Sequence, residues 1–263
     1  MKLGIVVEST GLALRPAIAE AARMSASGLQ VDAGGDLAAD RLGATGRREF
    51  RNLLRSFNQD LAALNVPLRQ GLDVAAHQQE RIEHVRTIMQ LAIDLGTRTV
   101  VVPCPKIPTE PASPRAVTMR ETLFALATHG DRIGIALALE IGFDAAATVK
   151  AYLASFDTGS LKVTFDPANL LMHGHDPLAN LAPLQGMIAH VHARDARSSG
   201  LSRGLQEVPV GAGDVDWLAF TATLQVIEFD GFLVVEREQG ENKLADVAAG
   251  VKFLRRFVTL TSS

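Results

Sequence analysis

Two hydrophobic periods alternate along the chain. Short runs rich in β-branched residues, bounded by Gly, Pro or a charged residue, precede longer stretches in which apolar residues recur every three or four positions. The short runs predict strands and the longer stretches predict helices. The predicted strands are Leu3–Val7, Leu29–Asp32, Val66–Gln70, Thr99–Pro103, Ile133–Glu140, Leu161–Asp166, Ile188–His192 and Phe232–Glu236.

The apolar stripes of two predicted helices are especially regular. One helix lies between the third and fourth predicted strands, and Gly96 stands where its C-cap is expected. Its apolar face consists of Ile82, Val85, Ile88, Met89, Ala92 and Leu95. The other predicted helix carries a single stripe made of Phe50, Leu53, Leu54, Phe57, Leu61 and Leu64.

The alternation of strands and helices indicates an α/β protein. Eight units in 263 residues average about 33 residues each, the size of a βα unit with its loops. Strands separated by helices pair in parallel, and eight parallel strands most often close into a barrel of about 250 residues. We therefore predict a single (β/α)8 TIM barrel spanning residues 1–263. A doubly wound open sheet is the alternative, but no Gly-x-Gly-x-x-Gly follows the first strand and no Walker motif occurs.

Two long segments that follow predicted strands, 103–114 and 194–213, are expected to be irregular. Their position places them at the end of the barrel where TIM-barrel enzymes keep their active sites.

Composition and charge narrow the class of partner. The chain is 47% hydrophobic and 21% charged, as in ordinary globular proteins, and its net charge of −3 gives no electrostatic reason to expect nucleic acid. A lone Cys104 excludes an internal disulfide and is typical of a reducing compartment. The apolar run at the start is too short for a signal-peptide core or a membrane span. We expect a cytoplasmic protein without a membrane partner, and the sequence is compatible with a homo-oligomer.

Ligand-type residues close four consecutive predicted strands. Glu140, Asp166, His192 and Glu236 end strands five to eight, separated by 26, 26 and 44 residues. The carboxyl ends of neighbouring parallel strands converge, so these side chains are expected to meet, and three carboxylates together would repel one another. One divalent cation removes that conflict, and the mixed O/N donor set suits Mn²⁺, Mg²⁺, Co²⁺, Fe²⁺ or Zn²⁺. The alternative is that each residue merely caps a helix or pairs with a basic side chain. This explanation would have to apply separately to all four residues.

The segments around these residues resemble a known superfamily. The resemblance rests on Asp166-Pro-Ala-Asn169-Leu, His190-Val-His192-Ala-Arg-Asp195, Val210-Gly211-Ala-Gly213-Asp214-Val-Asp216-Trp217 and Gly231-Phe-Leu-Val-Val-Glu236. They are similar to motifs of the xylose-isomerase-like TIM barrels, which include ketose 3-epimerases, hydroxypyruvate isomerases, inosose dehydratases and endonuclease IV. The likeness runs over nearly the whole chain and is sharpest from Glu140 onward.

The resemblance implies roles for the four residues. Glu140, Asp166, His192 and Glu236 would be the metal ligands, and Glu140 and Glu236 would also be the acid/base pair. The implied activity is isomerisation or epimerisation of a sugar or related hydroxy-carbonyl compound, by proton transfer through a metal-bound enediolate. The alternatives are a dehydratase acting on an inosose or keto acid, a non-catalytic sugar-binding barrel, and an endonuclease IV-like nuclease. The nuclease lacks support because Gln206-Glu207-Val208-Pro209 stands where that enzyme has an Asp-x-His pair.

The expected partner is a small-molecule carbohydrate substrate. Polar residues near the predicted site that could grip it are Asn169, Arg194, Arg197, Lys106 and Arg237. Glu8 and Asp32 close the first two predicted strands, and we interpret them as capping groups, with binding of substrate hydroxyls as the alternative. We interpret His190 as a packed core histidine, and His173 and His175 as solvated loop residues.

Overall fold

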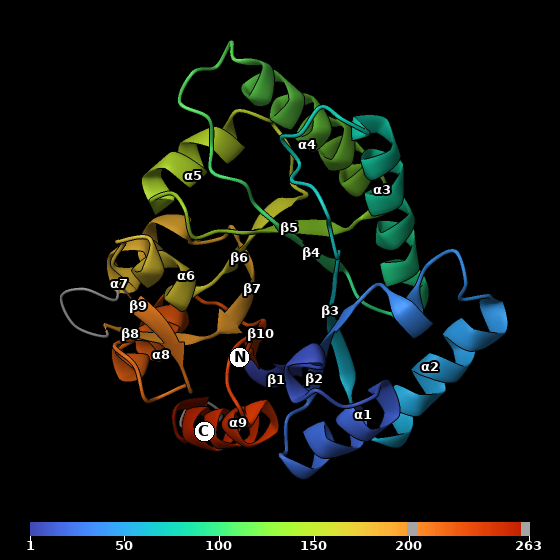
Figure 1. Ribbon diagram of the computed structural model, residues 1–263, viewed down its shortest axis with the longest axis vertical. Coiled ribbons are helices and arrows are strands. Elements are labelled where there is room, and N and C mark those ends of the chain that lie inside the picture. Colours follow the sequence, from blue (N-terminus) through green and yellow to red (C-terminus); the bar gives the residue numbers. More distant parts are fainter. Residues whose placement is uncertain (199–204, 259–263) are drawn as a thin grey trace.

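The computed structural model describes residues 1–198 and 205–258, and eight parallel strands close into a barrel (Figure 1). Around the barrel the strand order is β1-β10-β7-β6-β5-β4-β3-β2. The strands are β1 (Lys2–Val6), β2 (Gly28–Asp32), β3 (Asp60–Asn65), β4 (Thr99–Pro103), β5 (Ala136–Glu140), β6 (Leu161–Phe165), β7 (Ile188–Ala193) and β10 (Phe232–Val235). The predicted (β/α)8 barrel is therefore confirmed.

Helices surround the barrel and bury their apolar stripes against it. The α-helices are α1 (Leu14–Arg23), α2 (Ala44–Ser56), α3 (Gln78–Leu95), α4 (Pro114–Ile133), α5 (Ala146–Ala154), α6 (Pro167–Met172), α7 (Pro177–Leu181), α8 (Trp217–Val226) and α9 (Lys243–Val258). Short 3₁₀ turns are η1 (Glu8–Thr10), η2 (Gly35–Leu37) and η3 (Ala182–Leu184). The predicted stripe of α3 is buried, and Gly96 ends that helix in the left-handed region with φ 99°.

The third strand lies earlier in the chain than predicted. Val66–Gln70 was the expected strand, but β3 is Asp60–Asn65, and α2 ends at Ser56. Leu61 and Leu64, which the helical stripe included, are strand residues. The helix stops because Asn58 takes a left-handed conformation with φ 53°. The Leu-Ala-Ala-Leu run has no strand-like alternation, because residues 61–64 are all buried.

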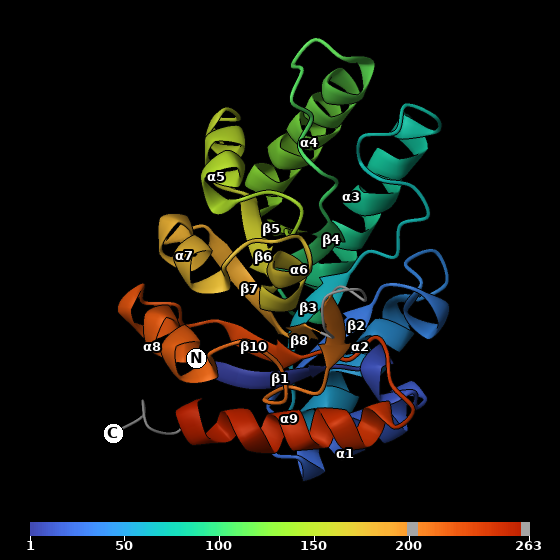
Figure 2. The same ribbon diagram turned by 60° about the vertical axis from the view of Figure 1, so that its left-hand side comes forward.

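Two further boundaries differ from the sequence prediction. The fifth strand does not start at Ile133, which is the last residue of α4; Gly134 turns the chain with φ 71° and β5 begins at Ala136. The segment 194–213 is not irregular throughout, because β8 (Asp195–Ser198) and β9 (Leu205–Val208) form an antiparallel hairpin beside α6 (Figure 2). In β8, Asp195 and Ala196 are buried and Arg197 is exposed.

Across residues 1–198 and 205–258, no helix combines the length and apolar character needed to cross a bilayer.

Candidate metal centre

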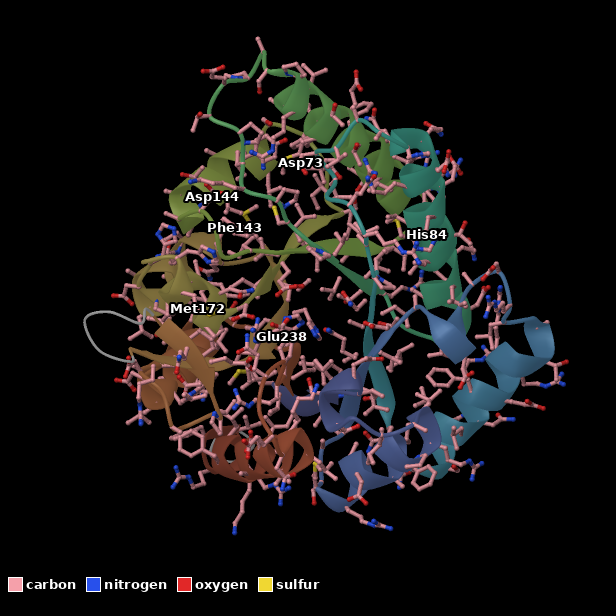
Figure 3. The ribbon with its side chains drawn as sticks, viewed as in Figure 1. Asp73, His84, Phe143, Asp144, Met172 and Glu238 are labelled. Atoms are coloured by element: carbon pink, nitrogen blue, oxygen red, sulfur yellow. The ribbon has the colours of Figure 1, made fainter. Side chains whose placement is uncertain are left out.

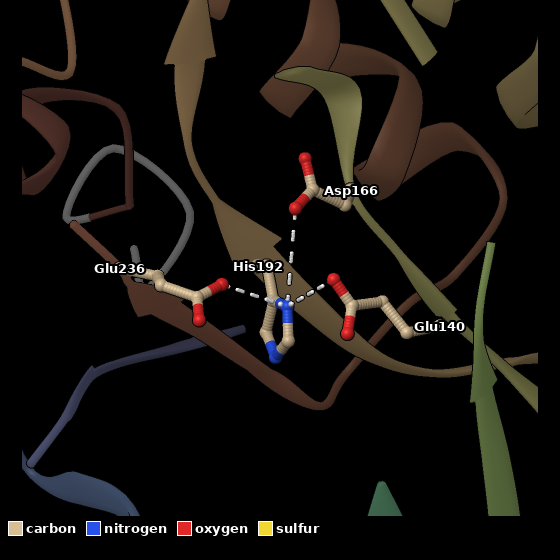
Figure 4. A group of neighbouring side chains, drawn as sticks. All are labelled: Glu140, Asp166, His192 and Glu236. Atoms are coloured by element: carbon tan, nitrogen blue, oxygen red, sulfur yellow. Dashed lines mark ion pairs between the residues drawn. The ribbon is translucent and has the colours of Figure 1, made fainter. Parts of the chain in front are cut away.

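The four ligand-type residues come together at the carboxyl end of the barrel. Glu140 is the last residue of β5, His192 lies in β7, and Asp166 and Glu236 directly follow β6 and β10. These strands are neighbours in the order β5-β6-β7-β10, so their ends adjoin. One donor atom from each residue lies within 4.8 Å of every other (Figure 4). Donors this close can share one divalent cation, whose ligands sit at about 2.0–2.4 Å.

His192 stands at the middle of the cluster. Its Nδ1 lies 2.9 Å from Glu236 Oε2, 3.6 Å from Glu140 Oε1 and 4.0 Å from Asp166 Oδ2. Burial lowers the pKa of the His192 imidazole, but the surrounding carboxylates outweigh burial and raise that pKa well above its ordinary value. Burial conversely raises the pKa of Glu236, and the imidazole outweighs it and lowers that pKa. The charge on each of these two side chains therefore favours the opposite charge on the other.

A bond to Gln30 of β2 supports a ligand role for His192. The Nε2 atom lies 2.8 Å from Gln30 Oε1, which can only accept, so Nε2 carries a proton and Nδ1 is the nitrogen that faces the cluster. His192 Nδ1 and Glu236 Oε2 are buried and have no hydrogen-bond partner. Buried polar atoms are normally hydrogen-bonded, so two potential ligand atoms that face each other without a hydrogen bond fit a cation held by both.

Asp166 is tied to the backbone and to a buried arginine. Its Oδ1 accepts the Asn169 N–H at 2.9 Å, which caps α6, and its Oδ2 accepts from Arg194 Nη1 at 3.0 Å. Burial raises the pKa of Asp166 to about 6, while Arg194 opposes this rise. Asn169 connects Glu140 to Arg194, because its Nδ2 donates to Glu140 Oε1 at 2.9 Å and its Oδ1 accepts from Arg194 at 3.2 Å.

Arg194 and Asn169, both predicted as substrate grips, thus contact the metal-ligand candidates directly. The Arg194 side chain is only 3% exposed, and its Nη2 donates to Glu238 Oε2 at 2.9 Å. Burial alone would lower the Arg194 pKa, but the carboxylates of Asp166, Glu236 and Glu238 raise it. Arg194 therefore supplies positive charge behind the carboxylate cluster, as a positioning residue for Asp166 and Asn169.

Two acidic residues of this network had no signal in the sequence. The Glu207 side chain of β9 is 2% exposed, and its carboxylate accepts hydrogen bonds from the backbone N–H groups of Glu238 and Gln239, each at 3.0 Å. This contact joins the hairpin to the loop after β10. Glu238 lies near the middle of the barrel mouth in the view of Figure 3. Neither residue ends a predicted strand, so only the tertiary fold brings them to Arg194.

The other predicted substrate grips lie in different surroundings. Arg237 is 8% exposed and donates to Asp246 Oδ2 of α9 at 2.9 Å. Lys106, in the loop after β4, and Arg197, in β8, are both exposed. Within residues 1–198 and 205–258, none of these three side chains forms a hydrogen bond or ion pair with the four-residue cluster.

The remaining histidines near the site have partners or packing of their own. The His173 ring bonds the Asn169 carbonyl at 2.7 Å, and His175 bonds the Phe143 carbonyl at 3.3 Å. His190 is 1% exposed, packs edge-on to His192 with ring centroids 5.5 Å apart, and burial holds its pKa well below the ordinary value. Its neutral, packed state agrees with a core histidine.

Asp195 organises the turn that follows the hairpin. Its carboxylate is fully buried and accepts from the backbone N–H groups of Ala196, Gly211, Gly213 and Val215 and from the Trp217 indole. A Cβ at Gly213 would lie 2.0 Å from Asp195 Oδ1, so the turn requires glycine there. The Gly-x-Gly-x-x-Asp segment thus binds Asp195 of β8 through its backbone and supplies none of the four candidate metal ligands.

Asp195→Ala is expected to destabilise the protein by about 3 kcal/mol or more, because it leaves several buried N–H groups without an acceptor. Chemical denaturation followed by circular dichroism measures the change in the free energy of unfolding. Asp230→Ala, at an exposed position, is the control and should change it by less than about 0.5 kcal/mol. Equal stability of the two variants would show that the Asp195 network does not hold this turn.

A hollow of about 310 Å³ adjoins the cluster. Its wall includes Glu236 and Gln30, which touch His192, and also Glu8, Asp32 and Asn65 at the ends of the first three strands. Asp32 accepts from Asn65 Nδ2 at 2.7 Å, and its backbone N–H donates to Glu8 Oε1 at 2.9 Å. Glu8 therefore caps the end of β2, as interpreted from the sequence, and both acids also line the hollow.

Known proteins resemble the chain in sequence and in fold. Residues 18–257 match the model of the xylose isomerase-like TIM barrel family. An inosose dehydratase of Lacticaseibacillus casei is 27% identical over 116 residues, a match spanning 39% of this chain and 39% of that enzyme.

Solved structures with the same fold cover nearly the whole chain. A xylose isomerase domain protein from Planctomyces limnophilus has a TM-score of 0.84 at 21% identity over 99% of both chains. A D-tagatose 3-epimerase-like protein has a TM-score of 0.79 at 17% identity over 99% of this chain and 98% of its own. A barrel from Mycobacterium smegmatis, solved in complex with magnesium, has a TM-score of 0.79 at 13% identity over 100% of this chain and 98% of its own. The closed barrel and the extent of the family match together show that this chain belongs to the xylose isomerase-like TIM barrel family.

Proposed function

We propose that the protein is a metal-dependent isomerase or epimerase of a sugar or a related hydroxy-carbonyl compound. The observation that carries the proposal is the cluster of Glu140, Asp166, His192 and Glu236, in which His192 Nδ1 and Glu236 Oε2 are buried without a hydrogen bond. The proposed ligands are these four residues, and the proposed acid/base pair is Glu140 and Glu236. A bound divalent cation would supply the positive charge that stabilises an oxyanion developing on the substrate.

The positions of the two glutamates support their proposed role as an acid/base pair. Glu140 and Glu236 stand on opposite sides of His192 (Figure 4) and are partly accessible, with side chains 18% and 13% exposed. One carboxylate can take a proton from the carbon next to a carbonyl, and the other can return a proton. Asn169 holds one oxygen of Glu140 in place, so its geometry is fixed before substrate arrives.

The site of proton return would decide the product. Return to the opposite face of the same carbon gives an epimer, and return to the neighbouring carbon gives the aldose–ketose isomer. Loss of a β-hydroxyl as water, with the abstracted proton, gives a dehydration product instead. The partial likeness to an inosose dehydratase favours that last reaction as the second candidate.

Solvent-deuterium exchange tests the proposal. The Mn²⁺- or Mg²⁺-loaded protein would be incubated in D₂O with ketoses, inososes and hydroxypyruvate, and the products followed by NMR. Deuterium next to a carbonyl is expected for at least one compound. Inversion at the labelled carbon identifies an epimerase, a shifted carbonyl identifies an isomerase, and a new alkene or its keto form identifies a dehydratase. Tight metal binding without exchange on any of these classes would count against catalysis and favour a non-catalytic binding barrel.

A further inference from the structure

A second, larger hollow lies at the same end of the barrel, away from the metal-ligand candidates. It has a volume of about 750 Å³ and lies between the loops that follow β2 and β3 and the beginning of α3. We call it the α3 hollow. Its charged and titratable lining residues are Arg69, Arg81, His77, His84 and a single acid, Glu80. Figure 3 labels His84 on α3, at the side of the barrel mouth.

A buried guanidinium without an acidic partner forms part of its wall. Arg81 is 7% exposed, and its hydrogen bonds go to neutral acceptors. Its Nη1 donates to the Ala76 carbonyl at 3.0 Å and to Gln70 Oε1 at 3.3 Å, and its Nη2 donates to the Val74 carbonyl. Within the part of the chain that the structure describes, no carboxylate forms an ion pair with this guanidinium, and its Nε has no hydrogen bond.

The acids nearest to Arg81 in the chain are engaged elsewhere. Asp73 pairs with Arg115, and Glu80 Oε1 lies 3.0 Å from His77 Nδ1. Carbonyl oxygens can solvate a guanidinium, but they do not cancel its charge. Burial of a charge is costly unless an opposite charge faces it. An anion taken up from solution would supply the missing counter-charge of Arg81.

The beginning of α3 offers further donors to such an anion. This helix of 18 residues starts at Gln78, and its N-cap residue, His77, makes no side-chain capping bond. The backbone N–H groups of Gln79 and Glu80 have no acceptor among the described residues. Free N–H groups at a helix N-terminus carry partial positive charge and bind phosphate. Glu80 lines the α3 hollow together with Arg81, so both kinds of donor adjoin the same space.

The neighbouring hollow has the opposite charge. It has a volume of about 470 Å³ and shares Gly34 and Pro67 with the α3 hollow. Glu8, Asp32 and Asp36 line it, and none of its described lining residues is basic. An anion is therefore repelled from this neighbouring hollow and attracted to the α3 hollow.

We propose that the α3 hollow binds a phosphate group, held by Arg81, by the free N–H groups at the start of α3 and by Arg69. Several phosphate oxygens can accept from a guanidinium and from backbone N–H groups at the same time. The hollow is much larger than inorganic phosphate, so the natural ligand is a phosphate ester whose organic part lies against Pro67 and Leu68. None of the four metal-ligand candidates lines the α3 hollow, so this inference does not depend on the proposed function.

NMR titration tests the site directly. The ¹⁵N-labelled protein would be titrated at constant ionic strength with inorganic phosphate and with phenyl phosphate, in the absence and in the presence of Mg²⁺. Saturable shifts are expected for the backbone N–H signals of Gln79 and Glu80 and for the Arg81 Nε–H signal. A Kd of about 1 mM is expected for inorganic phosphate, and the ester should bind more tightly.

Two arginine variants and a control measure the contribution of charge. Arg81→Met should weaken phosphate binding by about tenfold or more, as expected for a lost hydrogen bond to a charged group. Because Arg81 also holds loop carbonyls, Arg69→Gln provides a second test that leaves this guanidinium in place, and it should weaken binding by about threefold. Arg48→Gln, which makes the same change of charge at an exposed position of α2, should bind phosphate like the parent protein. Circular dichroism verifies that the variants are folded.

Mn²⁺ bound at the four-residue cluster distinguishes the sources of the phosphate. If the group belongs to the substrate, fructose 6-phosphate should bind with its sugar carbons strongly relaxed by Mn²⁺ and its phosphorus relaxed much less. If it belongs to a separate ligand, fructose 6-phosphate and phenyl phosphate should both bind with little relaxation of any nucleus.

Three results would overturn the phosphate site. The signals at the start of α3 show no saturable shift, or both arginine variants bind like the parent, or phosphate binds only with metal present and its phosphorus is relaxed strongly by Mn²⁺. The last result would place the anion on the cation itself. Deuterium exchange on unphosphorylated ketoses judges the proposed function separately, so either conclusion can fail while the other stands.

Discussion

Replacing either Glu140 or Glu236 by Gln should slow turnover and solvent-deuterium exchange by about 10²–10⁴-fold, the usual cost of losing a positioned acid or base. Gln preserves the shape of the side chain and one oxygen donor, but it removes the basic site. Substrate affinity should fall far less, because the cation and the polar groups of the hollow beside the cluster would still hold the hydroxyls. The measurement is proton exchange at saturating Mn²⁺ or Mg²⁺, on a substrate that the parent protein turns over.

Asp166→Asn is the matched control for these two variants. Asp166 is fully buried and bonds Arg194 and the Asn169 N–H, so its proposed role is to hold the cation rather than to move protons. Its loss should therefore weaken metal affinity and be partly rescued by excess metal, whereas the Gln variants should not be rescued. If both Gln variants exchange protons at the wild-type rate, these glutamates are ligands only, and the acid/base pair lies elsewhere in the pocket.

The barrel could be predicted because its signal is repeated along the chain. Seven of the eight predicted strands overlap the observed ones, and β3 is the exception. Its Leu-Ala-Ala-Leu core carries no two-residue alternation, because the strand is buried on both faces between β2 and β4. Period alone cannot distinguish such a run from the end of the preceding helix. The feature that ends the preceding helix is the left-handed backbone conformation of Asn58, which the hydrophobic pattern does not reveal.

The candidate cluster could be predicted for a related reason. The closure of a barrel places successive strand ends side by side, so the order of Glu140, Asp166, His192 and Glu236 along the chain already indicates their proximity. Contacts between strands that are far apart in the chain cannot be predicted from the order of the strands in this way. Gln30 reaches His192 across 162 positions of sequence, and neither residue's neighbours in the chain indicate this pairing.

The role of Arg194 also depended on the fold. The sequence placed this residue after a ligand candidate, where a substrate grip was a reasonable interpretation. The hairpin β8–β9 buries it among Asp166, Glu207 and Glu238, which makes it a counter-charge for carboxylates. An ion pair at this depth is costly to break, so Arg194 and its acids act as a unit. This fixed positive charge behind Asp166 leaves the open side of the cluster to Glu140 and Glu236.

His192→Ala should weaken divalent-metal binding by more than about 100-fold, since loss of a supporting group alone typically costs 10–100-fold. The variant removes the only nitrogen donor and leaves three carboxylates to bind by charge alone. Isothermal titration calorimetry with Mn²⁺ measures the affinity. His173→Ala, whose ring bonds the backbone at Asn169, is the matched control and should bind Mn²⁺ like the parent protein.

Gln30 allows the same prediction to be tested without touching a ligand. Gln30→Met keeps the volume of the side chain but removes the oxygen that fixes the proton on His192 Nε2. Mn²⁺ affinity should then fall by about 10–100-fold, because the ring is free to turn or to carry its proton on Nδ1. The pH dependence of binding should change as well, since the cation must compete with that proton. Wild-type Mn²⁺ affinity in Gln30→Met would show that β2 does not orient the imidazole. Tight Mn²⁺ binding by His192→Ala, in which His173 is unchanged, would instead place the metal site near the loop after β6.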